Sequence, residues 1–260
     1  MNPVALRFQD LKKKNQKALI PYIMGGDPDL ATTQRLLEML AENGADLIEV
    51  GVPFSDPLAD GPVIQAAGVR ALENGCTFQK LLQSLKPVLK KITIPVILMI
   101  YYNMIFQQGV EKFFDDIKEA GVAGLIIPDL PPDEADQLIG LGKKTGIGLN
   151  FLVAPTSNDL RIIKAAEAST GFVYAVSVKG VTGTRSQLPP ELPDFIKKIK
   201  SLTVKPVAVG FGVSRPEQAK KIVELADGVI VGSAVIKTII EDPTLVQTQR
   251  LITEIKAAIQ

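Results

Sequence analysis

Eight short apolar segments recur along the 260-residue chain and alternate with segments of helical patterning. The apolar segments predict strands buried on both faces, as in a parallel sheet. They span residues 18–24, 45–51, 95–101, 123–128, 146–153, 171–178, 206–210 and 228–232. The helical patterns span residues 29–43, 62–74, 78–91, 109–120, 133–144, 158–168, 190–200 and 216–225, and the first has Leu30, Thr33, Leu37 and Leu40 on one face. This regular alternation predicts an α/β fold with a parallel sheet.

The length of the chain favours closure of this sheet into a barrel. A (β/α)8 barrel typically needs about 250 residues, and no Ser/Gly-rich linker or low-complexity segment divides the sequence. An open sheet that binds a nucleotide would carry a G-x-G-x-x-G turn after its first strand, whereas residues 24–28 read Met-Gly-Gly-Asp-Pro. We therefore expect one domain over residues 1–260, a (β/α)8 TIM barrel whose functional residues follow the C-terminal ends of the strands.

The charge balance and the residue inventory exclude several classes of protein. Lys and Arg number 29 against 28 Asp and Glu, without a basic run, which argues against nucleic-acid binding. Cys76 is the single cysteine and histidine is absent, so a disulfide within the chain, a zinc or copper site of nitrogen and sulfur ligands, and a Ser-His or Cys-His triad are all excluded. We expect no metal, and acid–base chemistry by carboxylates, lysines or tyrosines.

Neither a membrane span nor a secretory signal is predicted. The longest apolar run, residues 94–102, contains Pro95 and is far shorter than the roughly 20 residues that cross a bilayer. Residues 1–17 are amphipathic with mixed charges and have no apolar signal core. We therefore expect a cytoplasmic protein without membrane association.

The second predicted strand carries a carboxylate, Glu49. Alternation along the strand places Leu47, Glu49 and Gly51 on one face and the β-branched Ile48 and Val50 on the other. Since the β-branched side chains should face the helices, Glu49 should point into the barrel, where desolvation raises the pKa of a carboxyl group and suits it to acid–base catalysis. The alternative is a structural ion pair, although the neighbouring strands contain no basic residue.

The loop after this strand, residues 53–62, carries Asp56 and Asp60. Asp60 could turn back over the barrel opposite Glu49. Its position before Gly61 and Pro62 also suits a helix N-cap, because proline fits the first helical turn, and the local sequence alone favours the cap. For Asp56 a solvated turn carboxylate is the simplest interpretation.

Two glycine clusters, residues 209–214 and 231–235, end the last two predicted strands. Backbone N–H groups exposed by Gly210, Gly212 and Gly232, with the helix that begins near Ser233, could hold a phosphate dianion without lysine. A phosphorylated small substrate is therefore expected. The alternative is that these glycines only terminate the strands.

A polar loop and four tyrosines complete the candidate site. The loop, residues 177–186, contains Gly180 and Gly183 and predicts a lid that excludes water. Its Lys179 could instead form a Schiff base, which is the main rival mechanism. The tyrosines map to the barrel core or rim and, with Phe211, would suit a planar aromatic ligand: Tyr22, Tyr101, Tyr102 and Tyr174.

One long motif carries a resemblance to a known family. Residues 47–65, LIEVGVPFSDPLADGPVIQ, are similar to the signature of the tryptophan synthase α-subunit family. Shorter motifs fall in order along the rest of the chain, at residues 25–28, 101–103, 128–131, 180–183 and 210–212. The resemblance implies a (β/α)8 barrel with an extra N-terminal helix. It also implies retro-aldol cleavage of indole-3-glycerol phosphate to indole and glyceraldehyde 3-phosphate, with no cofactor in this chain.

The resemblance also implies a role for each matching residue. Glu49 would transfer protons at indole C3 and at the substrate hydroxyl, and Asp60 would stay ionised against the indole N–H, which outweighs the cap interpretation. Tyr174 would pack beside Glu49, and Thr182 would hold Asp60 when the lid closes. The remaining contacts would be Gly183, Gly212, Gly232 and Ser233 for the phosphate, and Met99, Ile126 and Phe211 for the indole, together with Tyr22, which stands where the family resemblance leads us to expect phenylalanine.

The family further implies a partner, a pyridoxal-phosphate-dependent β subunit in an α2β2 complex that receives indole. Pro53, Asp56 and residues 103–106, including Asn103 and Phe106, match its contact loops and would be buried only in the complex. Four alternatives stay open: a Schiff-base aldolase, another phosphosugar barrel enzyme such as an isomerase, a non-catalytic activating subunit, and a stand-alone indole-releasing lyase.

Overall fold

The structure, a computed structural model, describes residues 2–176, 189–210 and 212–260. Its strands form one sheet in the order β5-β4-β3-β2-β1-β9-β8-β7-β6, and all eight neighbouring pairs are parallel. The strands are β1 (Ala18–Met24), β2 (Ile48–Gly51), β3 (Val96–Met99), β4 (Gly124–Ile126), β5 (Gly148–Leu149), β6 (Leu152–Val153), β7 (Val173–Val176), β8 (Val207–Gly210) and β9 (Gly228–Val231). Each lies within a predicted apolar segment.

The sheet closes through one segment, residues 148–153, which contains both β5 and β6. β5 pairs with β4, while β6 pairs with β7, so this single extended segment joins the two ends of the sheet. Between its halves, the Asn150 side-chain amide donates to the Leu125 carbonyl at 3.3 Å, and its oxygen accepts from the Phe172 N–H at 3.0 Å. The expected (β/α)8 barrel is confirmed, and its fifth strand is interrupted where Asn150 bridges both neighbours.

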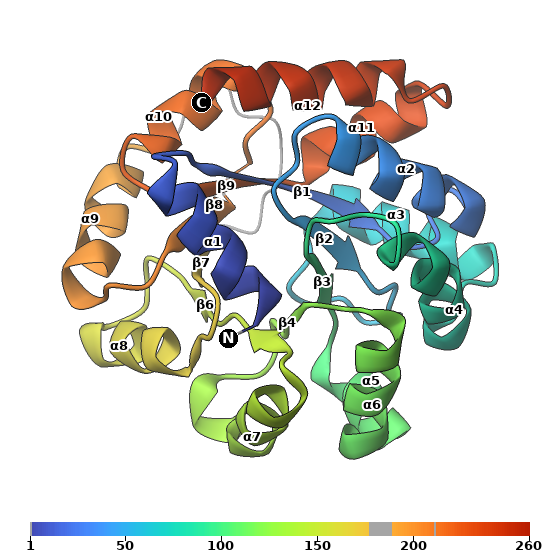
Figure 1. Cartoon of the computed structure of the whole chain (residues 1–260), viewed down its shortest axis with the longest axis horizontal. Helices are drawn as coiled ribbons and strands as arrows, with labels where there is room; N and C mark the ends of the chain where they lie inside the picture. Colours follow the sequence, from blue (N-terminus) through green and yellow to red (C-terminus); the bar gives the residue numbers. More distant parts are fainter. Residues whose placement is uncertain (1, 177–188, 211) are drawn as a thin grey trace.

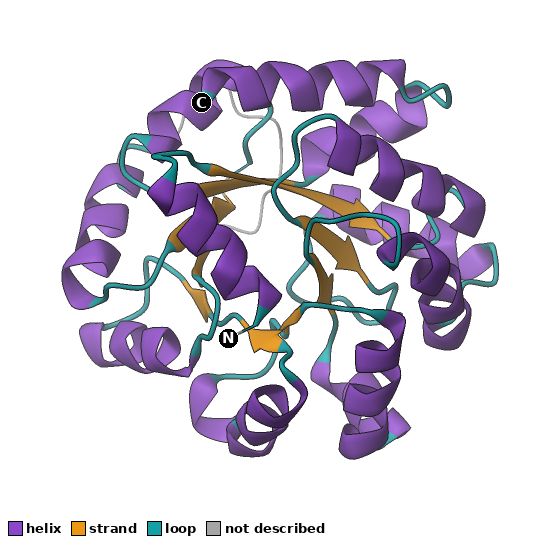
Figure 2. Ribbon diagram, in the orientation of Figure 1, coloured by secondary structure: helices purple, strands orange, loops and turns teal. Residues whose placement is uncertain are grey.

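Helices surround the strands (Figure 2). They are α1 (Pro3–Lys13), α2 (Leu30–Glu42), α3 (Pro62–Glu73), α4 (Phe78–Leu89), α5 (Tyr102–Gln108), α6 (Val110–Ala120), α7 (Asp136–Thr145), α8 (Asp159–Ala168), α9 (Leu192–Leu202), α10 (Pro216–Val223), α11 (Ser233–Glu241) and α12 (Val246–Ala258), with a 3-10 turn at Pro132–Glu134. The patterns predicted all the helices between strands except α5. That short helix follows β3 directly, and its first residues lie next to an apolar segment interpreted as strand.

The hydrophobic core has two layers. The outer layer lies between the sheet and the helices and contains Ile48 and Val50. The inner layer fills the barrel and includes Leu47, together with Val4, Phe8 and Leu11 of α1. Figure 1 shows α1 lying across one end of the barrel. The extra N-terminal helix is therefore confirmed, and it closes the barrel at the end opposite the expected site.

Aromatic rings link this helix to the expected site. The Phe8 ring of α1 lies 5.3 Å from the Phe172 ring, centroid to centroid, and Phe172 lies 6.2 Å from Tyr174 on β7. These rings fill the barrel beneath the expected site, because a packed interior leaves little room for voids.

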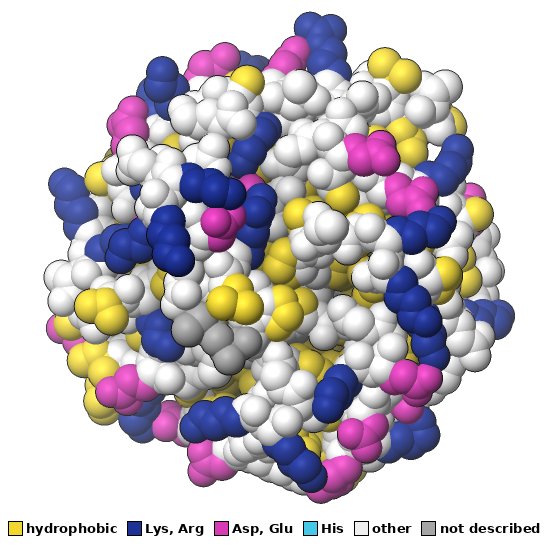
Figure 3. All heavy atoms as spheres, viewed as in Figure 1, with side chains coloured by type: hydrophobic (Ala, Val, Ile, Leu, Met, Phe, Trp, Pro, Cys, Tyr) yellow, Lys and Arg dark blue, Asp and Glu magenta, His cyan; other side chains and the backbone are white. Residues whose placement is uncertain are grey.

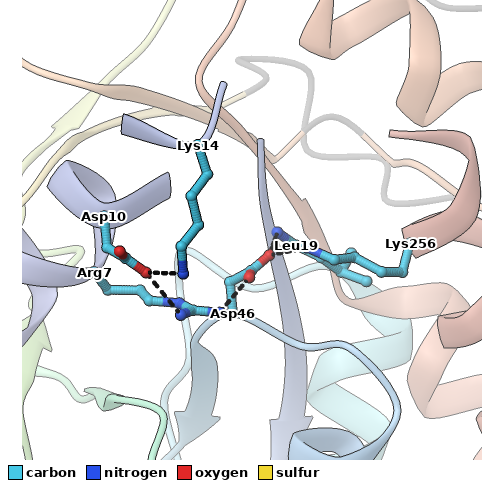
Figure 4. A network of polar contacts seen from close by, with 6 residues as sticks. All are labelled: Arg7, Asp10, Lys14, Leu19, Asp46 and Lys256. Atoms are coloured by element: carbon cyan, nitrogen blue, oxygen red, sulfur yellow. Dashed lines mark hydrogen bonds and ion pairs between the residues drawn. The ribbon is translucent and has the colours of Figure 1, made fainter. Parts of the chain in front are cut away.

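A buried ion cluster ties both ends of the chain to the barrel (Figure 4). Asp46, which directly precedes β2 and is almost fully buried, lies 2.6 Å from the Arg7 guanidinium and 2.7 Å from the Lys256 ammonium. Its second oxygen also accepts from the Leu19 N–H at 2.8 Å. One carboxylate therefore joins α1, β1 and α12 at the foot of β2.

The surface carries mixed charges. Figure 3 shows basic and acidic side chains interspersed over one face, which agrees with the near-zero net charge of +1. Within the described ranges no helix is long and apolar enough to cross a membrane.

The organisation of residues 1–260 as one domain stays a prediction.

Candidate active site

Glu49 points into the barrel, as the alternation along β2 predicted. Its neighbour at position 47 belongs to the inner core layer, and the side chain of Glu49 itself is fully buried. Neither carboxyl oxygen has a hydrogen-bond partner among the residues that the structure describes. The alternative prediction, that Glu49 forms a structural ion pair, is therefore wrong for the described part of the chain. Buried polar groups are nearly always satisfied, so an unpartnered carboxyl group makes Glu49 a candidate functional residue.

Asp60 lies in the loop between β2 and α3 and does not cap that helix. The N-cap is Gly61, and no side chain makes the capping hydrogen bond. The side chain of Asp60 is instead hydrogen-bonded to the hydroxyl group of Tyr101. The same hydroxyl oxygen accepts from the Ala59 N–H at 3.1 Å, and the Tyr101 ring stacks on Phe54 at 5.1 Å. The cap interpretation is wrong because Tyr101 holds this loop against the end of β3.

The two carboxyl groups have different pKa values. Burial, then the charge of Asp60, raises the pKa of Glu49 from 4.5 to about 8. Burial raises the pKa of Asp60 from 3.8 to about 6, opposed by the hydrogen bond from Tyr101. Between these values Glu49 is protonated and Asp60 is ionised. Two neighbouring titratable groups whose environments separate their pKa values can divide the roles of acid and base.

Two glycines make room for two buried phenols in the barrel. An ideal Cβ on Gly51 would lie 2.0 Å from the Tyr22 hydroxyl oxygen, and one on Gly210 would lie 2.9 Å from that of Tyr174. Burial raises the pKa of both phenols well above the usual value, and both carboxylates raise them further. The sequence analysis did not predict that Gly51 makes room for Tyr22. The one indication in the sequence was that Gly51 lies on the same face of the strand as Glu49.

The structure brings several of the expected indole contacts together. Ile126 is fully buried in the inner layer, and the half-buried Met99 packs against the same cluster. Tyr22, Tyr101 and Tyr174 are buried at the same end of the barrel, and Tyr102 is half-buried at the start of α5. The other expected residues lie outside the described residues: Lys179, Thr182, Gly183 and Phe211.

The expected phosphate contacts follow two adjacent strands. Gly210 ends β8, and Gly212, at φ +65°, has the left-handed backbone that favours glycine. On the neighbouring strand, Gly232 precedes α11, which starts at Ser233. The first turn of α11 contains no acidic residue, and its N-cap, Gly232, makes no side-chain capping hydrogen bond. The N–H groups of this turn therefore have no cap from their own N-cap residue and can bind an anion.

The expected partner-contact residues divide into two groups. Asp56, Asn103 and Phe106 are exposed, with 66% of Phe106 accessible. Pro53 and Ile105 are already buried within the chain alone, so the expectation that they are buried only in a complex is wrong. The loop turns Pro53 inward as it leaves β2. The sequence analysis missed Leu58, which lies in the same loop and is 95% exposed.

Across the described ranges, no group of three or more Cys, Asp or Glu side chains could hold a metal ion. The fold and the site together define a class of protein: a (β/α)8 barrel that holds two carboxyl groups of raised pKa, one on β2 and one in the loop that follows it. Comparison with known proteins gives the family. A family model described as tryptophan synthase alpha chain matches residues 8–259, and the chain belongs to this family.

Relatives and solved structures agree along the whole chain. The tryptophan synthase alpha chain of Synechocystis sp. is 49% identical over 263 residues and covers 100% of both chains. That of Rippkaea orientalis is 50% identical over 242 residues, which is 93% of this chain and 91% of the relative. The crystal structure of tryptophan synthase subunit alpha from Legionella pneumophila has a TM-score of 0.91 at 38% identity, covering 100% of this chain and 98% of that chain. Family membership gives the chain the role of a lyase in tryptophan biosynthesis.

Proposed function

We propose that this chain cleaves indole-3-glycerol phosphate to indole and glyceraldehyde 3-phosphate by a retro-aldol reaction. The observation that carries the proposal is the pair of carboxyl groups, Glu49 and Asp60, with pKa values of about 8 and 6 in a member of this family. Family membership does not favour another phosphosugar enzyme or a stand-alone lyase.

Glu49 transfers the protons in this mechanism. Its protonated form donates to indole C3, which leaves positive charge on the indole nitrogen. The resulting carboxylate then takes the proton from the hydroxyl group on the adjacent carbon. As that proton leaves, the bond between this carbon and C3 breaks, its electron pair returns to the ring, and the carbon becomes the aldehyde of the second product. Glu49 ends the cycle protonated, as it began.

Asp60 stabilises the charge that develops on the substrate. Its ionised carboxylate accepts the indole N–H and offsets the positive charge formed when C3 is protonated. Tyr101 orients this carboxylate through their hydrogen bond. Thr182, which lies outside the described residues, would replace or join that contact when the loop closes.

The remaining site residues bind the two ends of the substrate. Gly183, Gly210, Gly212, Gly232 and Ser233 hold the phosphate through backbone N–H groups and the N-terminus of α11. The indole is enclosed by aromatic and aliphatic side chains, namely Tyr22, Met99, Tyr101, Ile126, Tyr174 and Phe211. No step of this mechanism passes through a metal or an organic cofactor in this chain.

An alpha chain implies a beta partner, and we expect this one to be the pyridoxal-phosphate-dependent β subunit. The proposed assembly is a cytoplasmic α2β2 complex in which indole passes to the partner. Asp56, Asn103 and Phe106 would contact it, since all three are exposed and lie in the segments that follow β2 and β3. The exposed Leu58 extends this surface with apolar area, which is typical of an interface core.

The experiment that tests the function measures indole released from indole-3-glycerol phosphate by the purified chain, alone and with an added β subunit. Slow release that the partner accelerates supports the proposed function and the partnership. Rapid release without acceleration would support the lyase activity and contradict dependence on a partner. Release in neither condition would contradict the function itself.

Asp56→Ala tests the partner contact in the same assay. We expect it to weaken acceleration by the β subunit at least about fivefold, because it removes a charge from the contact surface. Release by the isolated chain and binding of inorganic phosphate should stay unchanged. Asp194→Ala, which removes an exposed carboxylate from α9, is the matched control. Equal effects of the two substitutions on acceleration would contradict a contact at Asp56.

The acid–base assignment predicts a bell-shaped pH profile. The free enzyme must hold Asp60 ionised and Glu49 protonated, so kcat/KM should fall below pH about 6 and above pH about 8. Initial rates of indole release between pH 5 and 9.5, in buffers of constant ionic strength, test this prediction. A rate that rises steadily through pH 8 would show that Glu49 must be ionised at the start, which is the opposite assignment.

A further inference from the structure

The hydroxyl group of Tyr22 occupies an unusual place beside Glu49. Tyr22 and Glu49 are register partners on β1 and β2, so their side chains start side by side on the inner face of the barrel. The next inward residue on β2 is Gly51, and its absent side chain leaves the space that the Tyr22 hydroxyl fills, 2.0 Å from an ideal Cβ. The phenol therefore lies across β2, one inward position beyond Glu49.

This hydroxyl group serves no structural contact in the described part of the chain. The Tyr22 side chain is 3% exposed, yet its hydroxyl makes no hydrogen bond with any described residue. Buried tyrosine hydroxyls usually find a partner. The hydroxyl of Tyr101 shows the contrast, since it is bonded to both Ala59 and Asp60. An unpartnered donor at the site is therefore available to a ligand.

The root of the same side chain lies toward the proposed phosphate site. The Tyr22 Cβ is 3.6 Å from an ideal Cβ on Gly232, the residue that precedes α11. The phenol thus reaches from the phosphate end of the site to the carboxyl end. A substrate whose phosphate lies at α11 and whose ring lies against Met99 and Ile126 would pass its three-carbon segment over Tyr22.

We propose that Tyr22 is a further catalytic residue, whose hydroxyl group donates a hydrogen bond to the substrate oxygen that loses its proton during bond cleavage. The inference rests on the proposed function. Tyr22 transfers no proton: the O–H bond of the substrate breaks toward Glu49, the oxygen becomes the aldehyde carbonyl, and the phenol keeps its own hydrogen. Burial and the charges of Asp60 and Glu49 raise its pKa, so the phenol remains a donor throughout the working pH range.

The donor acts where negative charge develops. As Glu49 removes the proton, the substrate oxygen gains charge before the carbon–carbon bond has broken, and a fixed donor stabilises that oxygen more than the starting alcohol. Removing one such donor from an oxyanion site costs about 100- to 1000-fold in kcat. The charge here is partial, so we expect Tyr22→Phe to lower kcat about 10- to 100-fold, with KM changed less than about threefold.

The test compares wild type and Tyr22→Phe in indole release and in binding of indole-3-propyl phosphate, a substrate analogue without hydroxyl groups. The ring of Phe has the same shape, so the analogue should bind both proteins within about twofold, while kcat falls. Thr248→Val is the control: it removes a buried hydroxyl, bonded to Thr238 at 3.0 Å, from the outer helix α12. Thr248→Val should lower the midpoint of urea unfolding and leave kcat unchanged. Tyr22→Phe should lower kcat and leave the midpoint of urea unfolding unchanged.

Three results would overturn the inference. A kcat within threefold of wild type would show that the hydroxyl contributes nothing to the reaction. Weaker binding of the analogue in proportion to the lost rate would show that Tyr22 acts only by shaping the pocket. A wild-type chain that released no indole in any condition would instead remove the proposed function, and this inference with it.

Discussion

Glu49→Gln is expected to lower indole release at least about a thousandfold. General acid–base catalysis by one group typically contributes about 100- to 10,000-fold, and in the proposed mechanism Glu49 serves in two successive proton transfers. Glutamine keeps the size of the side chain but neither donates a proton to C3 nor accepts one from the substrate hydroxyl. The measurement is kcat for indole release, with the β subunit present so that a low residual rate stays detectable.

The same substitution should stabilise the fold at high pH. The pKa of Glu49 rises from 4.5 to about 8 on folding, so its neutral form contributes stability fully below pH 4.5, and this contribution is lost as the pH rises toward 8. One pKa unit corresponds to about 1.4 kcal/mol, which makes the loss several kcal/mol over this window. Glutamine does not titrate, so the variant should be more stable than wild type at pH 8, with a smaller difference at pH 5.

Urea unfolding of both proteins at pH 5, 7 and 9 measures this difference. Glu167→Gln, which changes an exposed carboxylate on α8, is the control and should leave both activity and the pH dependence of stability unchanged. Equal pH slopes for wild type and Glu49→Gln would mean that Glu49 is not buried as a neutral acid. A variant that keeps more than a tenth of the activity would contradict its catalytic role. Together the two expected effects describe a residue retained for function at a cost in stability.

The alternation of side chains along one strand predicted the orientation of Glu49 because it is a local property. A strand has a period of two, and the β-branched Ile48 and Val50 had to face the helices, which left Glu49 inside the barrel. The apolar segment itself was longer than the strand, since residues 45–47 precede the ladder. Apolar patterning marks burial, whereas strand ends depend on hydrogen bonds to neighbouring strands.

Asp60 could not be placed from its local sequence. A carboxylate before Gly61 and Pro62 suits a helix cap better than a place in the site, and the outcome depends on Tyr101, which follows β3 some forty residues later. The family resemblance assigned Asp60 to the site, which stays a prediction, and the structure shows that Asp60 is not the helix cap. The role of Gly51 could not be predicted from its local sequence either. The space left by its missing side chain is filled by Tyr22, which comes from the neighbouring strand.

Helix α12 and the ion cluster around Asp46 differ in whether the sequence could have predicted them. Helix α12 was not predicted, although Ile252, Ile255 and Ile259 have helical spacing, so the signal was present in the sequence. The cluster around Asp46 gave no such signal. Its members, residues 7, 46 and 256, come from the two ends and the first quarter of the chain, and only closure of the barrel brings them together.

Asp46→Asn is expected to lower the free energy of unfolding by about 3–5 kcal/mol, the usual cost of removing one partner from a buried ion pair. The asparagine side chain still fits and can accept from the Leu19 N–H. It leaves the Lys256 ammonium without a counter-charge and leaves the Arg7 guanidinium with Asp10 alone, at 3.6 Å, in a site where Asp46 is 2% exposed and Lys256 13%. Urea unfolding at pH 7 measures the change, and the rate of indole release at low urea should stay near that of wild type.

Two further variants identify the cause of this loss. Glu254→Gln removes a surface carboxylate that pairs with Arg250 on α12, and its unfolding midpoint should stay within error of wild type. Adding Lys256→Met to Asp46→Asn should recover part of the lost stability, because it removes one uncompensated cation while keeping the apolar stem. If the double variant is less stable than Asp46→Asn alone, the loss comes from packing of α12 rather than from buried charge. An effect of Asp46→Asn below about 1 kcal/mol would place the cluster among surface ion pairs, which contribute little to stability.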